Sequence, residues 1–433
     1  MGLEFGEMAS GHARPKNGRQ PVKTIPLGKI ANVATGGTPI RDTPEYWGGS
    51  IPWVGTGQID FNIIQSPSDY LTEKGLAASA AKLLPKGTLL MAMYGQGATR
   101  GKVGILGIDA ATNQACAAIT PKDGLIESEF LFHVLEASYT RIRRLSNIGG
   151  QDNLNTTLIR EIPVPVLTKP ERDTVVAAAR EWTEGIQKTS DLLDALECRK
   201  QGLMQQLLTG RRRLKGFKGK WKTYRLGQLF AERNESNRSA LPLLSISRGE
   251  GIIPRDDSGR IDTSNEDKSA YLRICPGDIG YNTMRMWQGV SALSSLEGIV
   301  SPAYTVCSPT ELSDTRFMAH LFKLPSMINL FYRYSQGLTS DTWNLKFHHF
   351  SKIKVQAPQR DEQAAIANVL DEQNTELLAL AQQLEQLKTQ KRALMQKLLS
   401  GEWRLPESPA QVKSSSKKGL QPTATVRKQL LKK

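Results

Sequence analysis

The chain carries at residues 173–210 the stretch DTVVAAAREWTEGIQKTSDLLDALECRKQGLMQQLLTG, and a second stretch of the same pattern follows 191 residues later. In the first copy ten positions from Val175 to Leu207 recur in alternating steps of four and three, and the second copy repeats them from Ile366 to Leu398. This spacing is typical of the buried seam of a coiled coil. The central seam positions are Ile186, Leu193, Leu196, Lys200 and Leu203, and then Leu377, Leu384, Leu387, Lys391 and Leu394.

Each stretch predicts a helix of roughly 50 Å, at about 1.5 Å per residue. Two such helices, each with one apolar stripe, bury their stripes most simply against each other. The alternative is that each helix packs separately on its own domain. The lysine in each seam either fixes the register of the pair or extends its ammonium group to water near a helix end. Gly210 and Gly401 follow where a helix stop is expected.

A second repeat precedes the helices. Residues 22–33 read VKTIPLGKIANV and residues 221–232 read WKTYRLGQLFAE, with four identities at a constant offset of 199. The chain is therefore predicted to be a tandem duplication of one unit, a globular domain followed by a long helix. The predicted boundaries are a flexible leader at 1–21, domain 1 at 22–167, a first helix at 168–210, a basic linker at 211–220, domain 2 at 221–357, a second helix at 358–401 and a basic disordered tail at 402–433.

Both globular parts predict an α+β fold, with short strands first and a helix late. Strand-like runs separated by glycine-rich turns are at 51–54, 88–93, 102–106 and 115–119, and then at 243–247, 278–283 and 303–307. Helices are expected at 127–145 and near 314–335. The two copies differ most in their loops, as expected when one scaffold is kept and its binding specificity is changed.

The net charge of +15 favours a nucleic-acid partner. Two runs, 211–222 and 411–433, each hold seven basic residues and no acidic ones. A solvated linker and a disordered tail are the alternative explanation. The chain has no apolar run long enough to span a bilayer and no signal-peptide core, so a cytoplasmic protein is expected. The four scattered cysteines suggest neither a zinc site nor a disulfide framework.

Motifs for catalysis are missing from the sequence. An adenine methyltransferase needs a [D/N]-P-P-[Y/F] loop, and the chain contains no Pro-Pro. The run Gly95–Lys102 resembles a phosphate loop, but it lacks the first glycine and the Ser or Thr after the lysine. There is no HExxH, and His348-His349 is the only histidine pair. We expect a binding protein without a metal or cofactor of its own.

Taken together, the chain resembles the specificity subunits of type I restriction–modification systems, over roughly residues 22–401. The motifs are LGKIANVATGGTP (27–39), PEYWGGSIPWV (44–54), GQI (57–59), GKVGIL (101–106), NQACAAI (113–119), GGQDNLN (149–155) and the repeated LMQ-x-LL-x-G. The first helix start lacks the Glu-Gln pair present at Glu362-Gln363, and domain 2 lacks clear counterparts of GGTP and NQA.

The resemblance implies that each domain reads one half of a bipartite, asymmetric DNA site, and that an antiparallel coiled coil with pseudo-two-fold symmetry sets the gap. It also implies two modification subunits, which methylate adenine N6 with S-adenosylmethionine, and a restriction subunit that uses ATP and Mg²⁺. The specificity subunit itself is not catalytic. The rival hypotheses are a coiled-coil scaffold whose domains bind protein, and an enzyme with a cryptic nuclease or methyltransferase site.

Direct readout of DNA needs Arg, Lys, Asn or Gln at base edges. The candidates in and after domain 1 are Arg41, Gln58, Gln96, Arg100, Lys102, Gln151, Asn153, Asn155, Arg211, Arg212 and Arg213. Those in domain 2 are Arg248, Arg255, Arg285, Trp287, Thr339 and Ser340. A structural turn is the alternative for Gly149–Asn153, and packing is the favoured alternative for Tyr46, Trp47 and Trp53.

Overall fold

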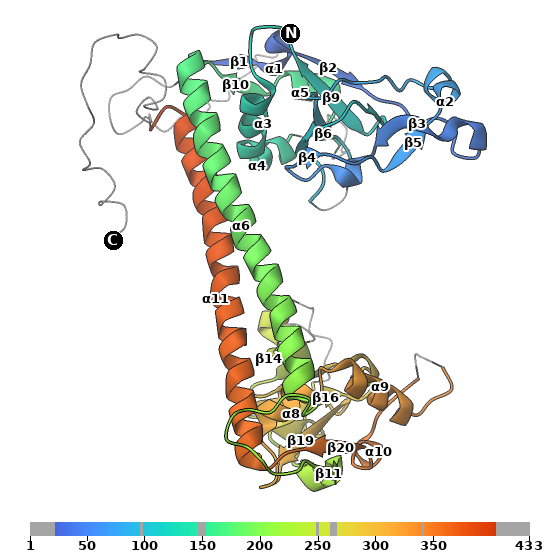
Figure 1. The fold of residues 1–433 in the computed structure, drawn as a ribbon, viewed down its shortest axis with the longest axis vertical. Helices are drawn as coiled ribbons and strands as arrows, with labels where there is room; N and C mark the ends of the chain where they lie inside the picture. Colours follow the sequence, from blue (N-terminus) through green and yellow to red (C-terminus); the bar gives the residue numbers. More distant parts are fainter. Residues whose placement is uncertain are drawn as a thin grey trace, which may run out of the picture. The chain divides into compact units, whose positions relative to one another are not determined.

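The computed structural model describes residues 22–95, 98–145, 153–247, 251–259, 266–339 and 342–403. These fall into two units, each with its own core (Figure 1). Unit 1 holds the described residues up to Gln187 and again from Glu385, and unit 2 is Lys188–Leu384. Each unit therefore contains one recognition domain and a part of both long helices.

The elements up to the first long helix are β1 (Thr24–Pro26), α1 (Leu27–Ile30), β2 (Ala31–Thr35), η1 (Pro44–Tyr46), β3 (Trp47–Val54), η2 (Thr56–Gln58), β4 (Ile63–Ile64), β5 (Asp69–Leu71), α2 (Glu73–Ala77), β6 (Leu89–Ala92), β7 (Val103–Leu106), β8 (Ala111–Thr112), β9 (Cys116–Pro121), α3 (Ser128–Ala137), α4 (Tyr139–Arg143), α5 (Thr156–Arg160), β10 (Pro163–Pro165) and α6 (Lys169–Leu207).

The elements after α6 are β11 (Lys222–Arg225), α7 (Leu226–Leu229), β12 (Phe230–Glu232), β13 (Leu244–Ser247), β14 (Gly251–Pro254), η3 (Asp256–Ser258), β15 (Leu272–Ile274), β16 (Ile279–Asn282), η4 (Met286–Gln288), β17 (Ser291–Leu293), β18 (Gly298–Val300), β19 (Tyr304–Pro309), α8 (Thr315–Leu321), α9 (Pro325–Tyr334), α10 (Phe347–Phe350), β20 (Lys354–Ala357) and α11 (Arg360–Leu399).

The predicted duplication is visible in the sheets. Domain 1 has a five-stranded sheet in the order β2-β9-β6-β7-β4, and domain 2 has a four-stranded sheet in the order β12-β19-β16-β17. The first four strands of one correspond to the four of the other, all antiparallel. In each domain the first strand also pairs with the last one before the long helix, as β1 with β10 and β11 with β20. The two domains therefore share one frame.

In each domain one face of the sheet packs against the late helices of that domain and against the long helices. In unit 1, Phe130 of α3, Val175 of α6 and Leu398 of α11 belong to one apolar cluster. In unit 2, Leu207 of α6 and Ile366 of α11 share a cluster with the domain core. The predicted mixed α and β composition with a long helix after each domain is confirmed.

Both predicted late helices are interrupted. The run at 127–145 forms α3 and α4, which break at Ser138, and the run at 314–335 forms α8 and α9. The second break precedes Pro325, which has no N–H for the preceding turn and opens the next helix instead. The periodicity identified the helical region in each case but did not locate the bend.

The ends of both long helices repeat in detail. Gly210 and Gly401 have left-handed φ values of 71° and 75°. The N–H of Arg212 bonds the carbonyl of Gln206 at 3.0 Å, and the N–H of Trp403 bonds that of Lys397 at 3.1 Å. This wide-turn bond past a left-handed glycine closes a helix and satisfies its last carbonyls. Among the described helices, none is both long and apolar enough to cross a lipid bilayer.

Candidate nucleic-acid interface

In domain 2 the loop after β16 and the loop before α10 are tied together. The N–H of Leu345 bonds the carbonyl of Thr283 at 2.9 Å, and the rings of Trp287 and Trp343 meet edge to face at 5.2 Å. Gln336 and Asn344 close the loop before α10 with two backbone bonds of 2.8 Å. Two segments that are far apart in sequence thus present one surface.

Domain 1 repeats this arrangement with different side chains. The N–H of Leu154 bonds the carbonyl of Met93 at 3.0 Å, and the loop after β6 therefore meets the loop before α5. The Arg100 guanidinium donates to the Arg143 carbonyl at 2.9 Å, and the Tyr139 hydroxyl donates to the Ala98 carbonyl. The two domains share these backbone contacts but differ in the side chains of the loops, and binding residues are commonly found on loops that a rigid scaffold positions.

Several sequence candidates lie in these paired loops. Arg100 and Asn153 are half-buried in domain 1, and Asn155 caps α5 by accepting the N–H of Leu158 at 2.8 Å. In domain 2, Arg285 and Thr339 are exposed. Trp287 is half-buried and donates its indole N–H to the Met284 carbonyl at 3.0 Å. Four further candidates lie outside the described residues: Gln96, Gln151, Arg248 and Ser340.

Three domain 1 candidates have partners elsewhere in that domain. Arg41 pairs with Asp69 at 2.8 Å, and its guanidinium lies 3.8 Å from the ring centre of Trp47. The Gln58 amide donates to the Ser66 carbonyl at 2.6 Å. Lys102 pairs with Asp60 at 2.5 Å. These contacts give each side chain a structural role, and their roles in DNA contact stay predictions.

The packing alternative is supported for two tryptophans. Trp53 is 4% exposed and donates its indole N–H to the Gly37 carbonyl at 3.1 Å. Trp47 meets it edge to face at 5.4 Å. Both rings belong to the small cluster between β3, β5 and β8.

The basic run after α6 divides into two kinds of residue. Arg211 and Arg212 are exposed, whereas Arg213 forms a two-pronged pair with Glu362 at the start of α11. The Glu362 side chain is only 4% exposed. The sequence grouped Arg213 with the DNA-binding candidates, but within unit 2 its guanidinium pairs with a buried carboxylate.

This pairing separates the three arginines experimentally. Arg213→Ala removes the cation that pairs with a buried carboxylate, so it is expected to lower the melting temperature of the chain clearly. Arg211→Ala removes the same charge from the same run and is the matched control, with an unchanged melting temperature. Differential scanning fluorimetry compares them, and equal melting curves for both variants would contradict the structural role of Arg213.

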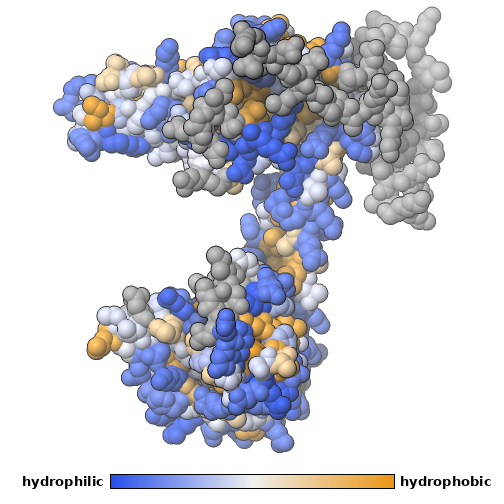
Figure 2. Space-filling model, turned by 180° about the vertical axis from the view of Figure 1, so that it is seen from behind, coloured by the Kyte–Doolittle hydropathy of each residue, from blue (hydrophilic) through white to orange (hydrophobic). Residues whose placement is uncertain are grey.

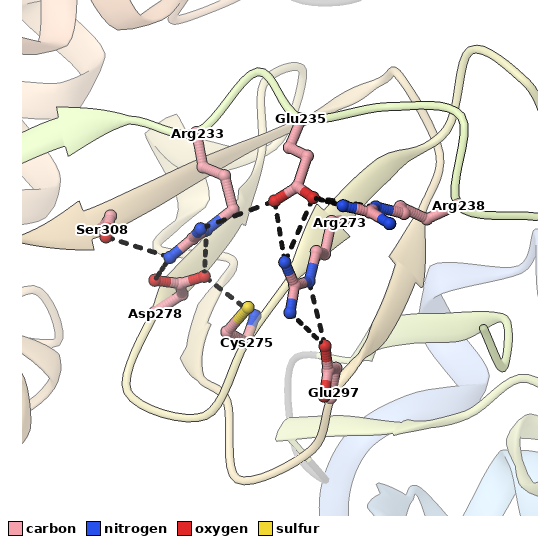
Figure 3. Close-up of polar contacts among 8 residues, drawn as sticks. All are labelled: Arg233, Glu235, Arg238, Arg273, Cys275, Asp278, Glu297 and Ser308. Carbon is pink, nitrogen blue, oxygen red and sulfur yellow. Dashed lines mark hydrogen bonds and ion pairs between the residues drawn. The ribbon is translucent and has the colours of Figure 1, made fainter.

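A further network distinguishes domain 2 (Figure 3). Arg233 pairs with Asp278 at 2.7 Å, and Asp278 is 2% exposed. Glu235 lies between Arg273 and Arg238, to which it is bonded at 3.0 and 2.7 Å. The strand pairing places Ala34 and Thr88 at the domain 1 positions of Arg233 and Asp278. The frame is the same, but domain 2 has a buried ion pair where domain 1 has Ala34 and Thr88.

The remaining domain 2 candidate outside the paired loops is Arg255. It follows β14, and its guanidinium donates to the Ser245 hydroxyl at 3.3 Å. The arginines of the network in Figure 3 were not among the candidates, and their ion pairs give no reason to add them. Residue type alone cannot separate an arginine that is paired within the domain from one that is presented to solvent.

Arg285 is the cleanest candidate to test because it is exposed at the tip of a fixed loop. If it reads a base, Arg285→Ala is expected to weaken specific DNA binding by about 1–3 kcal/mol and to relax one position of the site. Lys354→Ala on β20 removes an exposed cation elsewhere in the same domain and is the control. Binding titrations and methylation mapping measure both; unchanged values for Arg285→Ala would remove it from the list.

All ten seam positions of each long helix are buried or half-buried, as the 4-3 spacing predicts. The two seam lysines differ. Lys391 is 8% exposed and bonds the Glu136 carboxylate of α3 at 2.7 Å, within unit 1. Lys200 in unit 2 is half-buried, and burial lowers its pKa, which nearby Glu197 opposes. Neither alternative drawn from the sequence anticipated that Lys391 pairs with a recognition domain.

Comparison with known proteins agrees with this geometry. Residues 20–177 match the Type I restriction modification DNA specificity domain. The MjaIX specificity subunit of Methanocaldococcus jannaschii is 29% identical over 176 residues, 39% of this chain and 40% of the relative. The EcoR124I/EcoR124II specificity subunit of Escherichia coli is 25% identical over 190 residues, 41% and 46% of the two chains. The chain thus spans less than half the length of these curated relatives.

The fold extends the likeness beyond the first domain. A chain from a solved structure of the type I restriction–modification system aligns with a TM-score of 0.57 at 17% identity, covering 89% of this chain and 99% of the other. The specificity subunit of M. genitalium aligns with a TM-score of 0.51 at 14% identity, covering 89% and 98%. Residues 20–177 therefore carry a type I restriction–modification DNA specificity domain, and the resemblance of the chain to type I specificity subunits is confirmed.

Proposed function

We propose that the chain is the DNA-reading, non-catalytic subunit of a type I restriction–modification complex, and that each recognition domain reads one half of a bipartite, asymmetric site. The observation that carries this proposal is the pair of loops that each domain holds at the same place. Backbone bonds from Leu154 to Met93 and from Leu345 to Thr283 repeat, while the tips differ. Two domains with the same backbone bonds but different side chains in their loops are suited to reading two different half-sites.

The long helices are proposed to pair as an antiparallel coiled coil that sets the gap between the half-sites. In unit 1 the beginning of α6 and the end of α11 contribute to one cluster, and in unit 2 the end of α6 and the beginning of α11 do so. Arg199 of α6 also donates to the Gln373 amide of α11 at 2.7 Å, within unit 2. For antiparallel helices with pseudo-two-fold symmetry, the beginning of one helix is expected in the same unit as the end of the other.

The length of the helices suits this role. α6 has 39 residues and α11 has 40, which corresponds to about 58–60 Å at about 1.5 Å per residue. Two domains related by a pseudo-two-fold axis reach half-sites on one face of DNA about 34–36 Å apart, one helical turn. The helices are long enough to hold domains at such a distance.

The partners belong to the same proposal. Two modification subunits would methylate adenine N6 with S-adenosylmethionine, and restriction subunits would use ATP and Mg²⁺ to translocate and cleave DNA. The chain contributes recognition through its own residues. In particular, Arg211 and Arg212, which are exposed and follow the end of α6, are proposed to contact phosphates, and such contacts would give binding a steep dependence on salt.

Adenine-methylation mapping tests the proposal. DNA is taken from cells that express the chain with its modification subunit, and an asymmetric two-part motif with a fixed gap is expected. A methylome identical to that of cells lacking the chain, with the modification subunit active and bound, would favour the coiled-coil scaffold instead. Weak dependence of DNA binding on salt would point the same way.

A matched insertion then tests the spacer. Seven residues are added to α6 after Gln187 and seven to α11 after Leu384, where the chain passes between units. One heptad adds about 10 Å to each helix and keeps the seam in phase. We expect the gap to lengthen by about three base pairs at about 3.4 Å per step, with both half-sites unchanged. An insertion of five residues at each of the two places is the control, because it turns the seam out of phase and should abolish methylation.

A further inference from the structure

Two exposed apolar side chains occupy equivalent positions in the two domains. Tyr94 follows Met93, whose N–H bonds the Ala115 carbonyl at 2.9 Å and whose carbonyl accepts the N–H of Leu154. Met284 follows Thr283, whose N–H bonds the Ala303 carbonyl at 3.1 Å and whose carbonyl accepts the N–H of Leu345. Two pairs of backbone bonds therefore show that Tyr94 and Met284 hold equivalent positions, each two residues beyond the end of its strand.

Both side chains are exposed to the same extent, 42%. The exposed part of each side chain forgoes a share of the about 1.5–3 kcal/mol that complete burial would contribute, and it is free to contact a partner. On the face drawn in Figure 2, apolar atoms form small groups on a largely hydrophilic surface. Single exposed apolar residues are ordinary, but the same position in two diverged domains is a repeated feature of the frame.

The backbone around each position is held firmly. Asn282 accepts the N–H of Met284 at 2.9 Å, and the Trp287 indole N–H donates to the Met284 carbonyl at 3.0 Å. Met286, two residues on, is fully buried. In domain 1, Met93 is 2% exposed and anchors the residue before Tyr94. Met284 is therefore presented by a fixed backbone, and Tyr94 directly follows a fixed residue, as a contact that discriminates between bases needs.

We propose that Tyr94 and Met284 are specificity-determining residues, each packing against a thymine methyl group in the major groove of its own half-site. This inference rests on the proposed function. The C5-methyl of thymine is the apolar group that base edges present in the major groove, so it is the group an apolar tip distinguishes. Neighbouring Arg285 supplies a cation beside Met284, suited to a phosphate or a guanine.

The sequence candidates did not include either residue because, apart from Trp287, they were side chains that hydrogen-bond to base edges. Their position relative to the predicted strands is the signal in the sequence that could have identified them. Each stands directly after a predicted strand, at 88–93 and at 278–283, and before a turn. The equivalence of the two positions became apparent only when the strands were paired.

The test uses duplexes that carry the methylated site, with each thymine of the two half-sites replaced in turn by deoxyuridine. This change removes one methyl group only. The full chain with its modification subunit is expected to bind about fourfold more weakly when the critical thymine of either half-site is replaced, the effect of about one buried methyl group. Met284→Ser should abolish that sensitivity in the half-site of domain 2 alone, and Tyr94→Ser in that of domain 1 alone.

Each variant is therefore the control for the other, and Met284→Leu, which keeps an apolar tip, should retain the sensitivity. Deoxyuridine effects that persist in both serine variants, or wild-type binding that no single deoxyuridine weakens, would overturn the inference. Either side chain could instead insert between two bases and unstack them, and the fluorescence of 2-aminopurine in the duplex detects such unstacking. That result would also overturn the inference. If the wild-type chain shows no sequence preference at all, the proposed function itself fails.

Discussion

Phe350→Ala is expected to destabilise recognition domain 2 by about 4 kcal/mol, the usual cost of removing a fully buried aromatic ring and leaving a cavity. Phe350 of α10 has no exposed surface. Its ring centre lies 5.2 Å from that of Tyr281, 5.7 Å from Phe322 and 6.2 Å from Phe331. The ring therefore joins β16, which leads into the recognition loop, to the helices behind it.

The loss should be visible in two ways. Hydrogen exchange in β16 should accelerate, because its amides open when the domain core loosens. Methylation of the bipartite motif should fall at growth temperature. Leu312→Ala is the control in the same domain, since Leu312 is 48% exposed and surface substitutions usually change stability by less than about 0.5 kcal/mol. Equal effects of the two substitutions would show that the aromatic cluster does not hold the domain together.

Lys391→Met is expected to cost unit 1 about 3 kcal/mol, because it removes the ammonium of a buried ion pair and leaves the Glu136 carboxylate with the His133 ring as its remaining partner among the described residues. Lys391 and Glu136 retain 10% and 21% side-chain exposure, and their closest atoms are 2.7 Å apart. Lys200→Met changes the equivalent seam position in unit 2. There burial lowers the pKa of the lysine and no carboxylate bond is recorded within the described residues, so methionine should be neutral within about 1 kcal/mol or stabilising.

Acid offers a second readout of the same pair. Burial raises the pKa of the Glu136 carboxyl, but the bond from His133 and the Lys391 ammonium lower it by more, so it lies below the ordinary 4.5. A carboxyl whose pKa is depressed by folding stabilises the fold above pH 4.5, and that stabilisation is lost as pH falls through the lower folded value. Urea unfolding monitored by hydrogen exchange in α3 should show this acid loss in the wild type and less of it in Lys391→Met.

Local sequence signals located the repeated elements because those elements depend on local physics. The 4-3 spacing marks the buried stripes of α6 and α11, and Gly210 and Gly401 end them by adopting a left-handed conformation that favours glycine. The runs at 88–93 and 278–283 became β6 and β16. Apolar periodicity and turn chemistry act over a few residues, so they can be read from the chain directly.

Candidate contact residues were harder to predict because the sequence does not reveal their partners. Arg213, Arg211 and Arg212 are consecutive and chemically equal, yet only Arg213 faces the buried Glu362 carboxylate. Lys200 and Lys391 occupy the same seam position, yet Glu136 stands opposite only Lys391. These partners are 149 and 255 residues away along the chain, and only folding brings them within bonding distance.

The sequence by itself determined that the protein is a duplicated domain with a long helix after each copy, and that it resembles type I specificity subunits. Those conclusions rest on periodicity and on short motifs. Only the tertiary structure decided which loops meet, since the contacts of Leu154 with Met93 and of Leu345 with Thr283 are made between distant segments. It also placed Tyr94 and Met284 at equivalent tips, because equivalence in space follows from strand pairing, which short-range patterns do not encode.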